Sequence, residues 1–207
     1  MIQVESAPAP ALAGVWDAAV LGPVREINEQ VVDLLCEAAA SAGEECAGLL
    51  AVVRGEFLQA PAAARRRLAG CPYLLLDAGF GESARWARPA GVRDAPPPRA
   101  AAPPVIDCGV SLARRALVLG WHLARSNRLA ARVALGMTPA CADLVGALRL
   151  GELEAMAESD RGGVRLRWED RAELWRPLLR AALIERTATL SGLQMRGLQL
   201  LAAEDLR

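Results

Sequence analysis

The sequence predicts an all-α protein, and its composition and its periodicity agree on this. Hydrophobic residues make up 53% of the 207 residues, yet only two Phe and one Tyr accompany five Trp. The apolar content is therefore mostly Ala, Leu and Val, and alanine and leucine favour helices. Apolar residues also recur at helical spacing in both halves of the chain. We expect helices throughout, with little or no sheet.

A proline-rich stretch divides the chain into two parts. Residues 88–104 contain six prolines and one glycine, a composition that holds neither a helix nor a central strand. Such a segment is typical of a semi-rigid linker. We therefore expect two small helical units, and the expected divisions are an N-terminal tail 1–22, a helical unit 23–88, a linker 89–104 and a helical domain 105–207.

The first unit shows three helical patterns and one interruption. A helix is expected from about Val24, with Ile27, Val31 and Leu35 on one apolar stripe. A second is expected over 44–57, and a third after Pro61, because proline suits a first helical turn. Residues 71–80 break the pattern with a proline and a glycine, so they are expected to form either a short strand or a buried helical turn.

The second unit opens with a pattern typical of one long helix over residues 111–135. Arginines and one tryptophan lie on the face opposite the apolar stripe. They form either a solvated polar face or a partner interface, since Trp and Arg together are typical of protein interfaces. The candidate interface residues are Arg114, Trp121, Arg125, Arg128 and Arg132.

Two shorter helices follow. Thr138 followed by Pro139 is typical of a helix N-cap with proline at the first helical position. A second helix is expected over 150–158, with Leu148, Leu150 and Leu153 in the core. A basic segment, 164–170, then ends with Trp168, Glu169 and Asp170.

This region resembles the FlhD family, the D subunit of the bacterial flagellar master transcription activator. The resemblance covers roughly half the chain, from about Leu112 to the C-terminus. The matching positions are Leu135, Gly136, Leu144, Gly146, Ala147, Leu148, Leu150, Leu153, Ala157, Glu158, Arg167, Trp168 and Asp170. Residues 23–28 look like the opening of the family's first helix, so either the N-terminal half is a diverged repeat or an inserted segment splits a single unit.

The resemblance implies a transcriptional regulator that acts as an oligomer. In the family a zinc-bearing C subunit is the partner, and the C-terminal region is the one tied to DNA binding. The chain is about twice the usual family length. Its 24 basic residues, all arginine, balance 24 acidic ones, so positive charge for DNA must be local or come from the partner.

The last 35 residues carry the candidate DNA-binding residues. A helix beginning near Pro177 and a second over 193–204 are compatible with a helix-turn-helix and with a plain helical hairpin. Recognition helices need hydrogen-bond donors near their N-terminus. Five residues meet this need or lie beside it, namely Arg176, Arg180, Ser191, Gln194 and Arg196. Alternatively, these arginines pair with Glu173, Glu185 or Glu204 on a solvated surface.

Other classes of function find little support. The five cysteines are widely spaced without a CxxC pair, and His122 is the only histidine, so neither a metal site nor a cofactor is expected. No nucleophile, phosphate-loop or catalytic motif appears, and we expect no catalytic residues and no enzyme. No leader and no apolar run of about 18 residues is present, so we expect a cytoplasmic protein with reduced thiols.

The sequence therefore leaves two candidate functions. The first is an FlhD-like transcriptional regulator that binds promoter DNA with a partner subunit. The second is a helical scaffold or adaptor that binds another protein without contacting DNA. For the adaptor, the docking surface is either the face that carries Trp121 or the segment Tyr73–Phe80.

Overall fold

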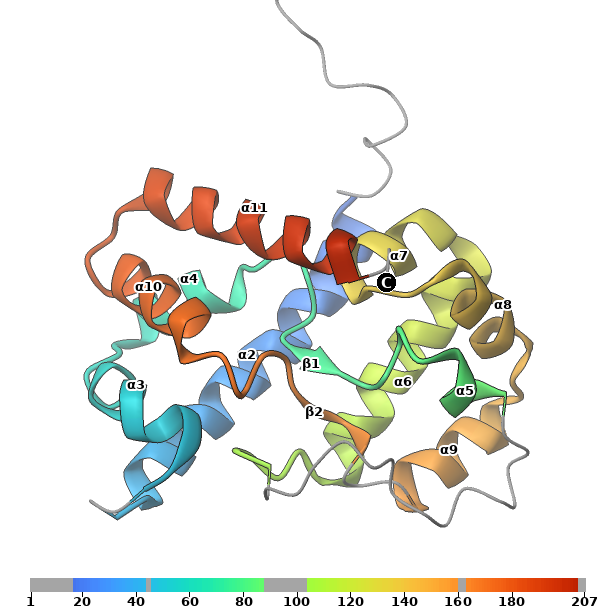
Figure 1. Ribbon diagram of the computed structural model, residues 1–207, viewed down its shortest axis with the longest axis horizontal. Helices are drawn as coiled ribbons and strands as arrows, with labels where there is room; N and C mark the ends of the chain where they lie inside the picture. Colours follow the sequence, from blue (N-terminus) through green and yellow to red (C-terminus); the bar gives the residue numbers. More distant parts are fainter. Residues whose placement is uncertain (1–16, 44–45, 88–103, 160–162, 205–207) are drawn as a thin grey trace, which may run out of the picture.

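A computed structural model describes residues 17–43, 46–87, 104–159 and 163–204, and it confirms the all-α prediction (Figure 1). The N-terminal part contains α2 (Ala18–Ser41), α3 (Gly48–Leu58), α4 (Ala62–Ala69), β1 (Leu76–Asp77) and α5 (Ser83–Trp86). The C-terminal part contains α6 (Gly109–Ser126), α7 (Arg128–Leu135), α8 (Pro139–Ala147), α9 (Leu150–Ser159), β2 (Arg165–Leu166), α10 (Ala172–Leu183) and α11 (Thr187–Glu204).

Helix α2 crosses the middle of the molecule and begins six residues before the expected Val24. The side chain of Asp17 caps it by accepting from the Ala19 amide at 3.3 Å. Pro23 is tolerated in the second turn, where it removes one hydrogen bond of the helix. The end of the expected tail 1–22 is therefore helical, while residues 1–16 lie outside the described part of the chain.

The long helix expected over residues 111–135 is two helices. The break falls at Asn127, whose backbone leaves the helical region at φ −149° and ψ 80°. Its side chain then accepts a hydrogen bond from the Ala130 amide at 3.0 Å and so caps α7. Asparagine favours such caps, a signal that the helical periodicity hides.

The turns around α8 are as predicted. Helix α7 ends at Gly136, whose φ of +70° favours glycine. The Thr138 side chain accepts from the Cys141 amide at 3.1 Å, and Pro139 occupies the first turn of α8. In α9, Leu153 is fully buried but Leu150 is 50% exposed, so Leu150 is not the core residue that its position in the motif predicts.

The end of the chain departs from the predicted boundaries. Helix α10 begins at Ala172, and Arg171 at its N-cap position makes no side-chain capping bond. Pro177 lies inside α10 instead of starting a helix. The chain turns at Glu185, which has a left-handed φ of 56°, and α11 then begins at Thr187. Residues 187–192, which precede the second helix expected over 193–204, are therefore the first third of α11.

The two predicted units share one hydrophobic core. Helix α10 packs against α3 and α4, and α2 packs against α6. The strands pair antiparallel across the same boundary, with Leu76 opposite Leu166 and Asp77 opposite Arg165. Buried residues of both parts form one continuous cluster. The expectation of two separately packed units is therefore wrong, because proline content locates a linker but does not say which surfaces pack together. Of the expected linker, only Pro104 lies among the described residues.

No single helix within these described ranges is long and apolar enough to cross a membrane. Helices α7 and α8 pass that test together on length and composition, but they are bent by 115° at the break between them.

Candidate nucleic-acid and partner surfaces

Two of the candidate DNA-binding arginines lie together on α10. Arg176 and Arg180 lie one helical turn apart, and both reach the same carboxylate oxygen of Glu56 on α3 at 3.3 Å. Their side chains are 47% and 57% exposed, whereas that of Glu56 is 16% exposed. One carboxylate thus faces two guanidinium groups, and one positive charge is left unbalanced at this place.

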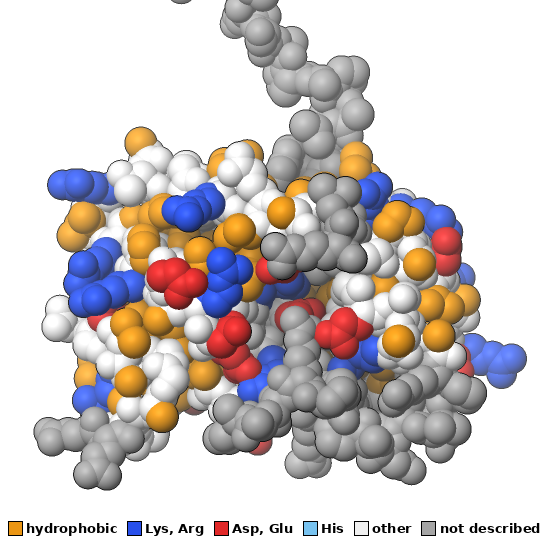
Figure 2. Space-filling view, viewed as in Figure 1, with side chains coloured by type: hydrophobic (Ala, Val, Ile, Leu, Met, Phe, Trp, Pro, Cys, Tyr) orange, Lys and Arg blue, Asp and Glu red, His pale blue; other side chains and the backbone are white. Residues whose placement is uncertain are grey.

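The neighbouring surface is a groove of about 500 Å³ between α3 and α10. Its lining consists of Val52, Ala172, Glu173, Arg176, Pro177 and Arg180. Figure 2 shows arginine side chains over this part of the molecule, where α10 and the start of α11 lie in Figure 1, with acidic side chains among them. The lining combines apolar residues of α3 and α10 with charged residues of α10.

The candidate residues on α11 do not lie near a helix N-terminus. Because α11 begins at Thr187, Arg196 is in the middle of the helix, and Ser191 and Gln194 lie in its second turn. Arg196 and Ser191 are exposed. The Gln194 amide points inward, with its Nε2 3.9 Å from the sulfur of Cys71. Contrary to the prediction, these three residues do not lie at the start of a recognition helix.

The expected partners of the arginines are also different. Glu185 pairs with Arg67 at 2.9 Å, and Glu173 pairs with Arg171 at 3.3 Å. Sequence reasoning missed Glu56, because it lies 120 residues from Arg176 along the chain. Only the packing of α3 against α10 brings them together.

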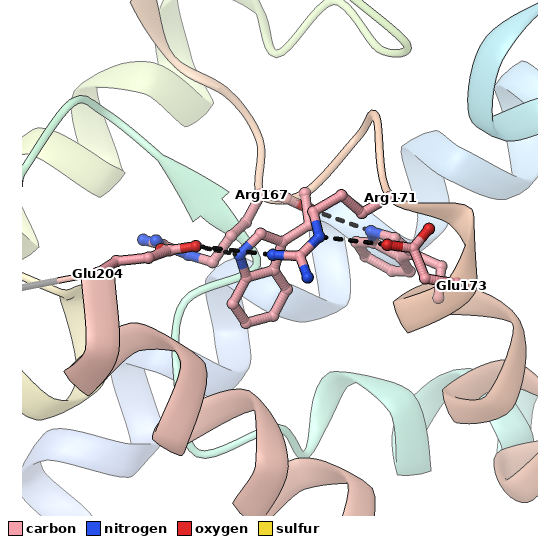
Figure 3. Close-up of polar contacts among 6 residues, drawn as sticks. Arg167, Arg171, Glu173 and Glu204 are labelled. Atoms are coloured by element: carbon pink, nitrogen blue, oxygen red, sulfur yellow. Dashed lines mark hydrogen bonds and ion pairs between the residues drawn. The ribbon is translucent and has the colours of Figure 1, made fainter.

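The segment after β2 forms a polar cluster at the start of α10 and the end of α11. Trp168 adopts a left-handed φ of 54°, and its indole N–H donates to Glu204 Oε1 at 3.0 Å. Arg171 points toward Glu173, while Glu204 reaches in from the end of α11 (Figure 3). These interactions tie the two helices to the loop that follows β2.

Behind this cluster, Arg167 is almost fully buried. Its guanidinium group donates to the carbonyl oxygens of Leu74, Leu76 and Leu135 at 3.0–3.1 Å. On the other side of the same segment, the buried Asn28 of α2 donates to the Tyr73 carbonyl at 2.9 Å and accepts from the Leu75 amide at 2.8 Å. Two residues of the family-like motifs therefore hold segment 73–76 in the core.

The segment Tyr73–Phe80 is not available as a docking surface. Tyr73, Leu74, Leu75 and Phe80 are all at most 1% exposed. The Tyr73 hydroxyl is buried beside the Cys71 thiol and borders a small cavity of about 30 Å³ between α10 and α11. Burial raises the pKa of this phenol well above its usual range.

The candidate partner face on α6 and α7 is largely occupied by contacts within the chain. Trp121 is only partly exposed; its indole N–H donates to the Leu148 carbonyl at 2.9 Å, and Arg125 lies over its ring at 4.7 Å. Arg128 pairs with Asp143 at 2.7 Å. The remaining candidates, Arg114 and Arg132, also make interactions, and Arg114 pairs with Glu158 at 3.5 Å. Of the two alternatives predicted for this face, these contacts favour the solvated polar surface over the partner interface.

The cysteines are free thiols. Cys36, Cys71, Cys108 and Cys141 are buried, and Cys46 is partly exposed. Burial raises the pKa of Cys71 and of Cys108 to about 12 each. Within the described ranges, no three side chains of the metal-binding types come together.

Comparisons with known proteins add no relatives. A scan against protein-family models found no match, nor did searches of curated proteins and of solved structures. The resemblance to the FlhD family stays a prediction from the quoted residues.

Proposed function

We propose that this protein is an FlhD-like transcriptional regulator that acts as an oligomer with a partner subunit on promoter DNA. In this proposal the surface of α10 and α11 faces the DNA backbone, and Arg176, Arg180 and Arg196 contact phosphates. Because the net charge of the chain is zero, DNA binding needs positive charge at one place on the surface, and in this proposal these arginines supply it.

The observation that carries the proposal is the pair of arginines on one carboxylate. Guanidinium groups bind phosphate oxygens through charge-assisted, often paired hydrogen bonds. Arg176 and Arg180 are held in place by Glu56, so part of the cost of ordering two long side chains is already met. Each keeps about half of its side chain exposed, with donors left for a phosphate.

Replacing the three arginines tests the DNA contact. We expect the assembled complex carrying Arg176→Gln, Arg180→Gln and Arg196→Gln to bind its promoter more weakly. The plot of log affinity against log salt should flatten by roughly one unit for each phosphate that the variant no longer binds. An electrophoretic shift series at several salt concentrations measures this. Unchanged affinity and slope would show that DNA is not contacted here and would favour the adaptor function.

Glu56→Gln is the matched control for the arginine variants, and it should change DNA affinity in the opposite direction. It keeps the shape of the side chain but removes the negative charge that competes with phosphate for both arginines. One charge at about 4 Å in water is worth about 1 kcal/mol, so we expect DNA affinity to rise about fivefold. If Arg176 and Arg180 serve only to pair with Glu56, this variant leaves DNA binding unchanged and lowers only the free energy of unfolding.

One observation supports the adaptor function, but it concerns a different surface from the two that the sequence predicts. Neither Tyr73–Phe80 nor the face around Trp121 is open, but α3 has an exposed apolar face that a protein partner could cover.

A further inference from the structure

Helix α4 brings a second group of arginines to the helix that carries Arg176 and Arg180. It contains Arg65, Arg66 and Arg67 in a row and no acidic residue. Helix α4 packs against α10, and the two lie side by side at one end of the molecule (Figure 1). The N-terminal part of the chain therefore adds positive charge next to α10.

Arg67 fixes the position of this group. Its Nε donates to the carbonyl oxygen of Ala182, in the last turn of α10, at 2.9 Å, and its Nη1 pairs with Glu185 at 2.9 Å. Arg66 and Arg186 directly follow or precede these two partners along the chain. The last turn of α4, the end of α10 and the turn before α11 therefore form one continuous surface.

Arg66 and Arg186 are the two arginines of this surface whose side chains are not engaged. Both residues are exposed, and within the described parts of the chain neither side chain makes an ion pair or a hydrogen bond. All five donors of each guanidinium group are therefore available to a ligand. Arg65 differs, because it pairs with Asp33 of α2 at 3.5 Å.

The charges at this place do not balance. The α4–α10 basic surface consists of Arg66, Arg67, Arg176, Arg180 and Arg186. Two carboxylates bind to it, Glu56 and Glu185. Five positive charges against two negative charges leave an excess of three, in a chain whose net charge is zero. The adjoining pair of Arg171 with Glu173 is neutral and does not change this excess.

We propose that the α4–α10 basic surface binds the phosphate backbone of DNA, so that Arg66 and Arg186 extend the contact from α10 and α11 to the N-terminal part of the chain. This inference rests on the proposed function, because it adds contacts to the same DNA. It gives the N-terminal part a role in binding in addition to its share of the common core.

The spread of the arginines favours a DNA strand over a compact anion. Ten residues separate Arg176 from Arg186, which is about 15 Å along a helix. One strand of DNA presents a phosphate about every 3.4 Å along the helix axis, so arginines spread over this length meet several phosphates of one strand. A single phosphate or carboxylate occupies only one or two of them. Arginine also matches phosphate geometry through paired hydrogen bonds.

Binding of the full chain to a random duplex of about 30 base pairs tests this, because phosphate contacts do not depend on the base sequence. Fluorescence anisotropy at several salt concentrations measures the affinity without a partner subunit. We expect Arg66→Gln combined with Arg186→Gln to weaken binding about tenfold or more at low salt. The slope of log affinity against log salt should fall by about two units. Arg66→Lys combined with Arg186→Lys keeps both charges and should restore the slope.

The matched control removes two arginines elsewhere on the surface. Arg115 on α6 and Arg149 before α9 are also exposed, so Arg115→Gln combined with Arg149→Gln changes the net charge equally. We expect this control to bind within about twofold of the wild type, because salt screens distant charges. Circular dichroism shows whether each variant folds. If the double variant does not, Arg66→Gln and Arg186→Gln alone should each lower the slope by about one unit.

Three results would overturn the inference. The first is a full chain that does not bind the duplex, and the second is an Arg66, Arg186 variant that binds like the control. The third is displacement of the duplex by polyglutamate at equal charge concentration, which would assign the surface to acidic protein segments. The proposed function has its own test on promoter DNA, so the second result leaves it intact if the variant of Arg176, Arg180 and Arg196 still binds the promoter more weakly.

Discussion

At the scale of residues, the buried Arg167 connects segment 74–76 to the end of α7. Arg167 binds three carbonyl oxygens, two from segment 74–76 and one from Leu135 at the end of α7. Its backbone amide also donates to the Leu75 carbonyl at 2.7 Å. The planar guanidinium group, with five donors, suits this arrangement, and a lysine ammonium group does not.

Replacing Arg167 should destabilise the protein strongly. Arg167→Met fills much of the same volume but leaves three buried carbonyl groups without their donor, at about 1–3 kcal/mol each. We expect the free energy of unfolding to fall by about 3 kcal/mol or more, and Arg167→Lys to recover only a small part. Urea denaturation followed by circular dichroism measures both. A loss below about 1 kcal/mol for Arg167→Met would mean that these hydrogen bonds contribute little.

The buried thiols predict a fall in stability at high pH. The native pKa of Cys71 and of Cys108 is about 12 because burial disfavours the thiolate, while the unfolded pKa is about 8.5. The folded state therefore holds protons that the unfolded state releases. The stabilisation is complete below the unfolded pKa and is lost as the pH rises toward 12. Denaturation midpoints between pH 7 and pH 11 should decline, and Cys71→Ala should decline less.

At the scale of elements, the residues of the FlhD-like motif fall into two groups. Some cap a helix, form a turn or pack in the core, and at least one is exposed to solvent. Thr138 and Gly136 form the turn between α7 and α8, and Leu153 anchors α9 in the core. Leu150, three residues earlier, faces solvent. The motif thus contains both residues that set the fold and at least one that does not.

A pair of leucine substitutions checks this division. Leu153→Ala creates a cavity in a packed core and should cost about 2–5 kcal/mol of unfolding free energy. Leu150→Ala removes a half-exposed side chain and should cost less than about 1 kcal/mol. Thermal or urea denaturation compares them directly. Equal losses would mean that Leu150 is covered in solution by another molecule or another part of the chain.

At the scale of the whole molecule, the two parts on either side of the proline-rich stretch depend on each other. Helix α10 packs against α3 and α4, and β2 pairs with β1. Truncation at residue 104 removes the carbonyls that Arg167 binds in segment 74–76 and exposes the buried face of α10, which includes Trp175, Leu178 and Leu179.

We therefore expect residues 105–207 alone not to fold cooperatively. The fragment should show a broad thermal transition and bind a hydrophobic dye, and adding a fragment of residues 1–104 should restore a cooperative melt. Calorimetry with and without the second fragment measures the difference. A cooperative melt of the isolated fragment would show that the shared core is not required.

The class of the fold and its local helix caps and turns could be predicted from the residues alone. Helical periodicity located most of the helices, and Thr138 with Pro139 located the start of α8, because caps and turns depend on neighbouring residues. The predicted helix boundaries were wrong in two situations. At Asn127 the helical periodicity concealed a capping residue. In α10 and α11, residues typical of helix ends, such as Pro177, lie inside the helices.

Which distant residues contact one another emerges only from the packing of the folded chain. The pairing of Glu56 with Arg176 and Arg180 spans more than a hundred residues, and no local pattern records it. The same is true of the carbonyls around Arg167 and of the exposed side of α3, whose apolar residues are as consistent with a buried helix as with a surface one. Periodicity gives the faces of a helix, but the packing of the whole chain determines which face stays open.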